Sequence, residues 1–212
     1  MSYRVKEAFY TLQGEGEHAG TPAVFVRLSM CNLWDGREEH RERDAAKGGC
    51  ARWCDTQFRG IDGVNGGAYT SPEQLADLVR RLGPDAPIVV LTGGEPALQV
   101  DALLVASLRA RGLRVHVETN GTLPLPPVDW VTLSPKPPAG VVLAAADEVK
   151  LVFDPLLDVE AFRGLAERRW LQPRWDQDTD RRKENEASCI KYIIAHPWWR
   201  LSLQTHKLCG ML

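Results

Sequence analysis

The order of apolar and polar positions predicts alternating strands and helices after an irregular N-terminal third. Residues 4–11 and 23–29 are rich in β-branched and aromatic side chains and predict two strands, which a glycine-rich turn joins. Residues 35–49 then form a polar insertion. Within it, residues 35–47 predict a solvated helix or loop with no function of its own.

The middle of the chain predicts a helix followed by a buried strand. Ser71 is suited to cap a helix, Pro72 to its first turn and Gln74 to a capping box, and apolar residues recur at helical spacing up to Leu82. Residues 87–92, PIVVLT, are almost wholly apolar, which is typical of a strand buried on both faces of a parallel sheet. A further helix is expected before Gly112.

The C-terminal half continues the alternation. Strands are expected at 114–118, 130–133 and 148–153, and helices near 158–168 and 181–195. Repeated β–α units predict a parallel α/β sheet or a partial barrel, with functional groups at the carboxyl ends of the strands.

Composition narrows the class of protein. A chain of 212 residues predicts a single domain over residues 1–212, with the insertion at 35–49. Charged residues make up 25% and the formal net charge is −2, so no nucleic acid or membrane partner is expected. No export pattern and no apolar run of ~20 residues is found. Together with five cysteines, an odd number, this predicts a reducing, cytoplasmic location.

Three of the five cysteines, Cys31, Cys50 and Cys54, fall within one short stretch. Three thiolates with a vacant fourth position suit an iron–sulfur cluster in which one iron stays open for a ligand. Zinc prefers a fourth protein ligand, which His40 would supply, and three unrelated buried thiols are the other alternative. The cysteines alone favour the cluster and leave all three interpretations open.

Three short polar motifs come directly after predicted strands, where a parallel sheet carries its chemistry. Thr92-Gly93-Gly94-Glu95-Pro96 combines glycines that let a ligand approach the backbone with a carboxylate. Glu118-Thr119-Asn120-Gly121-Thr122 and Ser134-Pro135-Lys136-Pro137 repeat the arrangement after the next strands. The first motif has a plain alternative as a strand-to-helix turn with Glu95 in the first helical turn. Three such motifs at consecutive strand ends predict a binding site.

At this point the chain resembles the 7-carboxy-7-deazaguanine synthases, radical S-adenosylmethionine enzymes of queuosine and other deazapurine biosynthesis. The resemblance spans nearly the whole chain and rests on FYTLQGEG (9–16), FVRL (25–28), CNLW (31–34), WCDT (53–56), LTGGEP (91–96), ETNG (118–121), LSPK (133–136), LQP (171–173) and LSLQTHK (201–207). The cysteine, GGEP and ETNG motifs are common to radical S-adenosylmethionine enzymes, whereas FYTLQGEG, CDT, SPK and SLQTHK are particular to this family.

The resemblance implies a modified, partial (β/α) barrel with mainly parallel strands and a definite reaction. A [4Fe–4S] cluster would bind and reductively cleave S-adenosylmethionine to a 5′-deoxyadenosyl radical. That radical would take hydrogen from C6 of 6-carboxy-5,6,7,8-tetrahydropterin, which then contracts its ring and loses ammonia to give 7-carboxy-7-deazaguanine. Mg²⁺, a flavodoxin- or ferredoxin-type electron donor and a homodimer are also implied.

The resemblance also assigns roles to residues. The cluster ligands would be Cys31, Cys50 and Cys54, and Thr56 would bind Mg²⁺. Substrate contacts are expected from Leu12, Gln13, Gly14, Glu15, Arg27, Thr92, His206 and Leu212. Cofactor contacts are expected from Trp53, Gly94, Glu95, Glu118, Ser134, Pro135, Lys136, Gln172 and Pro173.

The chemistry of the side chains agrees with these roles. The Arg27 guanidinium matches a carboxylate, while Gln13 and Glu15 match the donors and acceptors of a pterin edge. Arg27 as a structural ion pair and His206 as a structural histidine are the alternatives. Cys189 and Cys209 are expected to be packing residues.

The chain departs from the family pattern in two places. Three residues instead of two separate Cys50 from Cys54, and the motif that begins with Leu171 continues with Arg174 and Trp175. Two functions of other classes remain as alternatives: an activase for a glycyl-radical enzyme, and a non-catalytic zinc-binding module.

Overall fold

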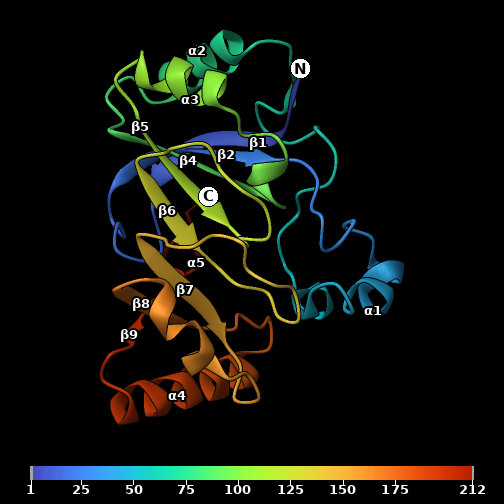
Figure 1. Ribbon diagram of the computed structural model, residues 1–212, viewed down its shortest axis with the longest axis vertical. Coiled ribbons are helices and arrows are strands. Elements are labelled where there is room, and N and C mark those ends of the chain that lie inside the picture. Colours follow the sequence, from blue (N-terminus) through green and yellow to red (C-terminus); the bar gives the residue numbers. More distant parts are fainter. Residues whose placement is uncertain (1, 212) are drawn as a thin grey trace.

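A computed structural model describes residues 2–211, and one nine-stranded sheet contains all of its strands in the order β3-β1-β2-β4-β5-β6-β7-β8-β9. Neighbouring strands from β2 to β9 are parallel, and β1 is antiparallel to both β2 and β3. Figure 1 shows that the sheet twists strongly from β1 to β9, which gives the open, partial barrel that was predicted. The strands are β1 (Tyr3–Leu12), β2 (Pro22–Leu28), β3 (Gly67–Tyr69), β4 (Ile88–Gly93), β5 (Arg114–Thr119), β6 (Trp130–Leu133), β7 (Glu148–Phe153), β8 (Arg168–Pro173) and β9 (Arg200–Leu201).

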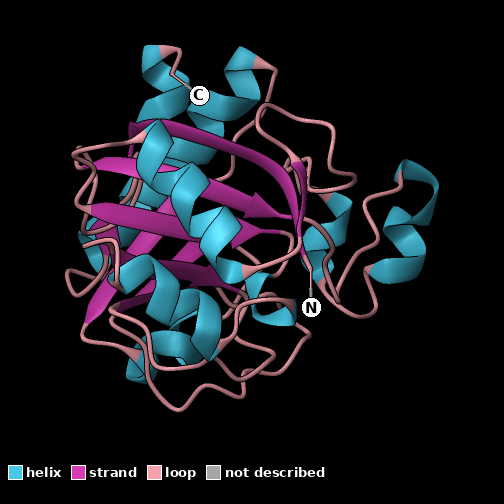
Figure 2. Cartoon of the chain, turned by 90° about the horizontal axis from the view of Figure 1, so that it is seen from above, coloured by secondary structure: helices cyan, strands magenta, loops and turns pink. Residues whose placement is uncertain are grey.

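Helices α2, α3 and α4 pack against the outside of the sheet (Figure 2). In Figure 1, α2 and α3 lie at the β1 end and α4 at the β9 end, and each group closes its own apolar core. None of the helices within residues 2–211 is long and apolar enough to cross a membrane. The helices are α1 (Arg41–Asp44), α2 (Pro72–Leu82), α3 (Ala102–Arg109), α4 (Thr179–Ala195) and α5 (Thr205–Cys209), with 3-10 helices η1 (Glu38–His40), η2 (Gly49–Arg52), η3 (Pro96–Leu98) and η4 (Val159–Leu165).

Local sequence explains where the helices of the main body begin. The Ser71 hydroxyl accepts a hydrogen bond from the backbone N–H of Gln74 at 3.3 Å, which confirms the predicted cap of α2. Asp101 caps α3 in the same way through the N–H of Leu104 at 2.8 Å. These caps satisfy backbone donors that the first helical turn leaves unpaired.

One predicted element was wrong. The helix expected near 158–168 is only the 3-10 helix η4, and residues 168–173 form the strand β8. β8 pairs on one side with β7 and on the other with β9. Backbone hydrogen bonds to two neighbours outweigh the weak helical pattern of this stretch. The short elements β3, β9 and α5 were also missed.

The polar insertion is more than a solvated surface. Figures 1 and 2 both show α1 standing away from the sheet, as expected for a polar segment. Yet the Asp44 side chain in α1 is only 1% exposed, and it forms ion pairs with Arg43 at 2.9 Å and Lys47 at 3.2 Å. Hydrogen bonding to Arg43, which outweighs the opposing effect of burial, holds the pKa of Asp44 well below its usual range. The insertion therefore has a small ordered centre of its own.

Candidate active site

A cavity of about 460 Å³ opens at the carboxyl ends of the strands, where the sequence predicted the site. Most of the predicted site residues line it, although they come from segments far apart in the chain. The lining includes Leu12, Gln13, Gly14, Glu15, Arg27, Cys31, Cys50, Trp53, Cys54, Thr56, Thr92, Gly94, Glu118, Ser134, Lys136, Gln172 and His206. Glu95, Pro135 and Pro173 do not line the cavity, and Leu212 lies outside the described residues.

The three clustered cysteines all reach this cavity. Cys31 follows β2, whereas Cys50 and Cys54 lie in and just after η2; all three are free, half-buried thiols. The N–H of Cys54 donates to the Cys50 carbonyl at 2.7 Å, so one hydrogen-bonded turn accommodates the extra residue between them. Burial raises the pKa of Cys31, and raises that of Cys50 to about 11. Metal binding must therefore displace thiol protons here.

The donor set fits an iron–sulfur cluster. Trp34 and Phe58 pack edge to face at 5.5 Å between ring centroids, in an apolar cluster that includes Cys31 and Cys54. Within residues 2–211, no three His, Cys, Asp or Glu side chains converge on the position of a single metal ion. Thiolates that each bind a different iron do not need to converge in that way.

A zinc site that uses His40 is not supported by the geometry. The Nδ1 atom of His40 lies 2.5 Å from Asp35 Oδ2, and His40 is not among the residues that line the cavity. The insertion instead contacts residues 50–56, here called the cysteine loop, through Arg41. Its terminal nitrogens donate to the carbonyls of Ala51 at 2.6 Å and Cys54 at 3.1 Å, and its guanidinium stacks on Trp34.

The glycines of the GGEP motif allow the Cys31 loop to approach. A Cβ atom at Gly94 would lie 2.2 Å from the Met30 carbonyl oxygen and 2.8 Å from the Cβ of Cys31. The N–H of Glu95 donates to the same Met30 carbonyl at 2.9 Å. Thus the backbone after β4 fixes the position of the first cysteine.

Glu95 is not among the residues that line the cavity, and it holds two strand ends together. Its carboxylate, which is fully buried, accepts hydrogen bonds from the Thr119 hydroxyl and the Asn120 N–H, both at 2.7 Å. Burial raises its pKa, although these hydrogen bonds oppose the shift. These hydrogen bonds join the end of β4 to the ETNG motif. The predicted contact of Glu95 with a cofactor remains a prediction.

The SPK motif meets the cysteine loop across the cavity. Lys136 Nζ donates to the Ser134 hydroxyl at 2.6 Å and lies 5.8 Å from the centroid of the Trp53 ring. Pro135, between these two residues, is buried and does not face the cavity. A cation beside an aromatic ring is suited to a ligand with both a carboxylate and a flat base.

A buried charge network connects the predicted substrate and cofactor residues. Lys150 of β7 donates to Glu15 Oε2 and lies 3.7 Å from Glu118. Gln13 donates to Glu118 at 3.0 Å, while Gln172 donates to Glu15 at 3.2 Å. Burial would raise the pKa of Glu15, but the charge of the adjacent Lys150 outweighs it, so the pKa of Glu15 is lowered. Burial would lower the pKa of Lys150, but the charges of Glu118 and Glu15 outweigh it, so the pKa of Lys150 is raised. Glu15 and Lys150 are therefore both charged near neutral pH.

Arg27 also lines the cavity, where it forms an ion pair. Its Nε atom donates to Glu7 at 2.8 Å, and both side chains are half-buried. No other ion pair of Arg27 is found among residues 2–211, which leaves its terminal nitrogens available to a ligand. Thr92 is buried at the end of the adjacent strand β4.

The C-terminal segment covers one side of the cavity. A Cβ atom at Gly14 would lie 2.4 Å from His206 Nδ1, so Gly14 permits this close approach. Burial lowers the pKa of His206. Lys207 Nζ lies 2.5 Å from Asp55 Oδ2, next to Thr56, and this ion pair joins α5 to the cysteine loop.

The sequence analysis missed several lining residues. The most important is Lys150, together with Glu7 and Gln204, whose amide donates to Glu15 at 3.0 Å. A lysine within the mostly apolar strand EVKLVF was the available indication, because a charge buried in a sheet requires a partner. Glu7 carried no such indication, whereas Gln204 lies in the LSLQTHK motif, which the family resemblance had already marked.

Comparison with known proteins gives a consistent result. No family model matches the chain. The 7-carboxy-7-deazaguanine synthases of Bradyrhizobium diazoefficiens and Caulobacter vibrioides are each 49% identical to it, with all of both chains covered. The synthase of Bordetella pertussis is 47% identical, also over both full chains. The crystal structure of QueE from Escherichia coli superposes with a TM-score of 0.70 at 30% identity, covering 96% of this chain and 94% of that one.

Proposed function

The chain belongs to the 7-carboxy-7-deazaguanine synthase family, and from this membership we propose that it converts 6-carboxy-5,6,7,8-tetrahydropterin to 7-carboxy-7-deazaguanine with release of ammonia. When bound, the [4Fe–4S] cluster and S-adenosylmethionine supply a carbon-centred radical that takes hydrogen from C6 of the pterin. The product would enter the queuosine and deazapurine pathways. No observation favours a glycyl-radical activase or a zinc module.

One observation carries the proposal: a single cavity receives the three cysteine thiols, the Lys136 amine and the Arg27 guanidinium. The thiols and Lys136 with Trp53 are suited to hold the cluster and S-adenosylmethionine. Arg27 and the network around Glu15 are suited to the carboxylate and the polar edge of a pterin. The direct test is anaerobic turnover of the pterin by the reconstituted protein, with the product identified by mass spectrometry.

Replacing Arg27 should separate substrate recognition from radical formation. In Arg27→Ala the pterin carboxylate loses a charge-assisted contact, which costs on the order of 2–5 kcal/mol if the pair is buried. We expect pterin binding and product formation to collapse, while uncoupled cleavage of S-adenosylmethionine continues. A pterin without the carboxylate should bind equally weakly to both proteins.

Glu7 provides the matched control for this variant. Glu7→Gln removes the charge paired with Arg27 but keeps the guanidinium in the cavity. Pterin binding should therefore survive in Glu7→Gln and fail in Arg27→Ala. Should Arg27→Ala lose iron and S-adenosylmethionine cleavage as well, Arg27 would be a structural residue and the substrate assignment would be wrong.

We also propose that Thr56 supplies an oxygen ligand to Mg²⁺ beside the substrate. Thr56 lines the cavity in the CDT motif, and a hydroxyl suits a hard cation that also binds water and substrate oxygens. Thr56→Val keeps the shape of the side chain and removes the ligand. Turnover should fall and the concentration of Mg²⁺ needed for half-maximal rate should rise; an unchanged Mg²⁺ titration would exclude this role.

The remaining expected partners follow from the family and stay predictions. A flavodoxin- or ferredoxin-type protein would deliver the electron, and the chain would act as a homodimer. Sedimentation of the cluster-loaded protein tests the second of these.

A further inference from the structure

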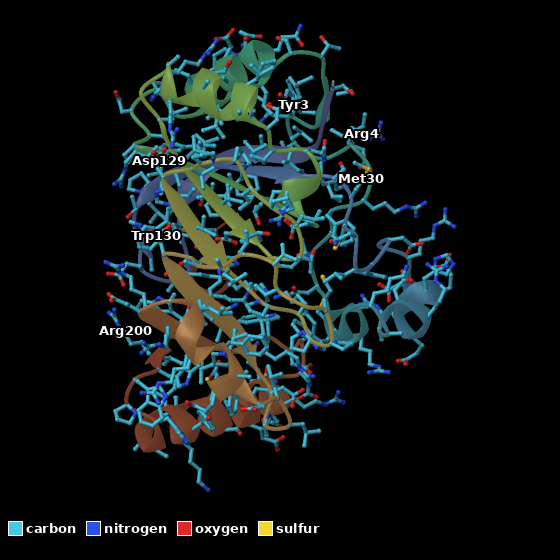
Figure 3. The ribbon with its side chains drawn as sticks, in the orientation of Figure 1. Tyr3, Arg4, Met30, Asp129, Trp130 and Arg200 are labelled. Carbon is cyan, nitrogen blue, oxygen red and sulfur yellow. The ribbon has the colours of Figure 1, made fainter. Side chains whose placement is uncertain are left out.

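The side chain of Lys150 reaches the active-site cavity from the middle of β7. Figure 3 labels Trp130 and Arg200, the first residues of β6 and β9, on the side of the molecule where these parallel strands begin, and the cavity opens at their opposite ends. Successive side chains of a strand point to opposite faces. Val149 and Leu151 are buried in the core beside α4, so Lys150 between them faces inward, lines the cavity and is only 8% exposed. A buried ammonium group requires a compensating charge.

Two carboxylates from different elements supply that charge. Glu15, in the loop between β1 and β2, accepts a hydrogen bond from the Lys150 ammonium, and Glu118 of β5 lies 3.7 Å from the same nitrogen. The two carboxylate side chains are 12% and 20% exposed. The family resemblance assigns Glu15 to the substrate and Glu118 to the cofactor. Lys150 therefore joins the two predicted ligand sites, although the resemblance gives it no role in either.

The other hydrogen bonds of Glu15 fix the direction in which its carboxylate faces. Its Oε1 atom accepts from the amides of Gln172 at 3.2 Å and Gln204 at 3.0 Å, while Oε2 accepts from Lys150. Both amides are neutral. His206 also acts on Glu15, but burial lowers the pKa of His206 and leaves its ring mainly neutral near pH 7. The charge of buried Glu15 is therefore balanced chiefly by Lys150.

We propose that Lys150 is a positioning residue for substrate recognition, which holds Glu15 as an ionised carboxylate facing the N–H donors of the pterin. This inference rests on the proposed function, because it takes the pterin as the ligand of Glu15. The aminopyrimidinone edge of a pterin presents neighbouring N–H groups, and an ionised carboxylate accepts hydrogen bonds from both. A protonated carboxyl group would instead set an O–H donor against one of them. Lys150 thus acts on the substrate through Glu15 and needs no contact of its own with the ring.

The test measures pterin binding to Lys150→Met as a function of pH. Cluster-loaded protein with S-adenosylmethionine and no reductant is titrated calorimetrically with 6-carboxy-5,6,7,8-tetrahydropterin from about pH 6 to about pH 9, below the melting temperature of every variant. In the wild type burial opposes the charge of Lys150, which nevertheless keeps the pKa of Glu15 lowered, so Glu15 is ionised throughout this range. In Lys150→Met burial raises that pKa unopposed, and Glu15 is protonated at the acid end of the range.

We expect Lys150→Met to bind the pterin about ten-fold more weakly than the wild type near neutral pH. The difference should become smaller as the pH rises, because Glu15 then ionises and regains its acceptor role. The ratio of the two dissociation constants at each pH removes the titration of the pterin itself, which both proteins share. A residue that only supports the fold would weaken binding by the same factor at every pH.

A double variant assigns this pH dependence to Glu15. Glu118 and Glu148 also act on the Lys150 charge, and His206 acts on that of Glu15. Lys150→Met/Glu15→Gln keeps these three other groups and removes the titration of Glu15, so its affinity relative to the wild type should not change with pH. Glu15→Gln alone should bind the pterin as weakly as the double variant, because Lys150 then has no carboxylate to hold at that position. This last comparison does not require Lys150→Met to fold.

The outcomes distinguish this inference from the proposed function. A ratio for Lys150→Met that is constant with pH overturns the role of Lys150, as does a pH dependence that persists in the double variant. Weaker binding by the double variant than by Glu15→Gln also overturns it, because Lys150 would then act independently of Glu15. A wild type that converts the pterin alongside any of these results leaves the proposed function intact. A wild type that neither binds nor converts the pterin contradicts the proposed function, and the role of Lys150 falls with it.

Discussion

Alanine at Cys31, Cys50 or Cys54 is expected to abolish cleavage of S-adenosylmethionine, because each substitution removes one of three thiolate ligands. The three thiols share one cavity, and no other cysteine within residues 2–211 lines it. Two thiolates do not hold a four-iron cluster with one open iron. Iron and sulfide should therefore fall well below the wild-type content. The measurements are metal analysis and the yield of 5′-deoxyadenosine under anaerobic conditions.

The other two cysteines serve as controls. Cys209 is exposed on α5, so Cys209→Ala should leave both cluster and activity intact. Cys189 is fully buried in the α4 core; Cys189→Ala should lower stability through a small cavity and keep the cluster. Full iron loading and activity in Cys54→Ala would refute the ligand assignment.

Removing the Lys150 charge should destabilise the fold as well as the site. Lys150 is the shared cation of Glu15 and Glu118, and Lys150→Met leaves those carboxylates near each other without it. Breaking a buried pair in this way costs about 3–5 kcal/mol. For a chain of this size we expect the melting temperature of the cluster-loaded protein to fall by on the order of 10 °C. Lys183→Met, an exposed change on α4, is the control.

The pH dependence of this loss has a definite sign. In the wild type the folded-state pKa of Glu15 is lowered, so its stabilising contribution is present at neutral pH and is lost as the pH falls. In Lys150→Met, burial without the cation raises the pKa of Glu15 above its unfolded value, and protonation then stabilises the fold. The difference in stability between the wild type and Lys150→Met should therefore become smaller as the pH falls from about 8 to about 5.

A second substitution tests whether the pair is responsible. Lys150→Met/Glu15→Gln removes both charges of the closest pair and should be more stable than Lys150→Met alone. A deficit that stays constant across the pH range, or a double variant that is less stable than the single one, would show that Lys150 acts through packing.

The fold was predictable where the apolar pattern is strong. Strands β6 and β7 begin and end at the predicted residues, and the largely apolar β4 was located to within one residue at each end. β8 was missed because its sequence, RRWLQP, has only two apolar residues in succession. Its strand geometry comes from pairing with β7 and β9, which a local pattern does not contain.

The site was predictable where motifs end strands. Cys31, Gly94, Ser134 and Gln172 all line the cavity from predicted positions. The sequence did not reveal that Glu95 faces inward, because its orientation depends on hydrogen bonds to Thr119 and Asn120 from a different strand. The pairing of Glu7 with Arg27 was equally inaccessible, since neighbours in a sheet are set by register.

The contact of Arg41 with the cysteine loop has a practical consequence for anyone who shortens this protein. The insertion looks dispensable in the sequence, yet its Arg41 donates hydrogen bonds to the carbonyls of Ala51 and Cys54. Cys54 is one of the proposed cluster ligands. A flexible linker in place of residues 35–47 would conserve every cysteine and still release the backbone that spaces two of them. Deletions for crystallisation or fusion should therefore be made elsewhere in the chain. A shorter loop is tolerable only where hydrogen bonds equivalent to those of Arg41 are kept.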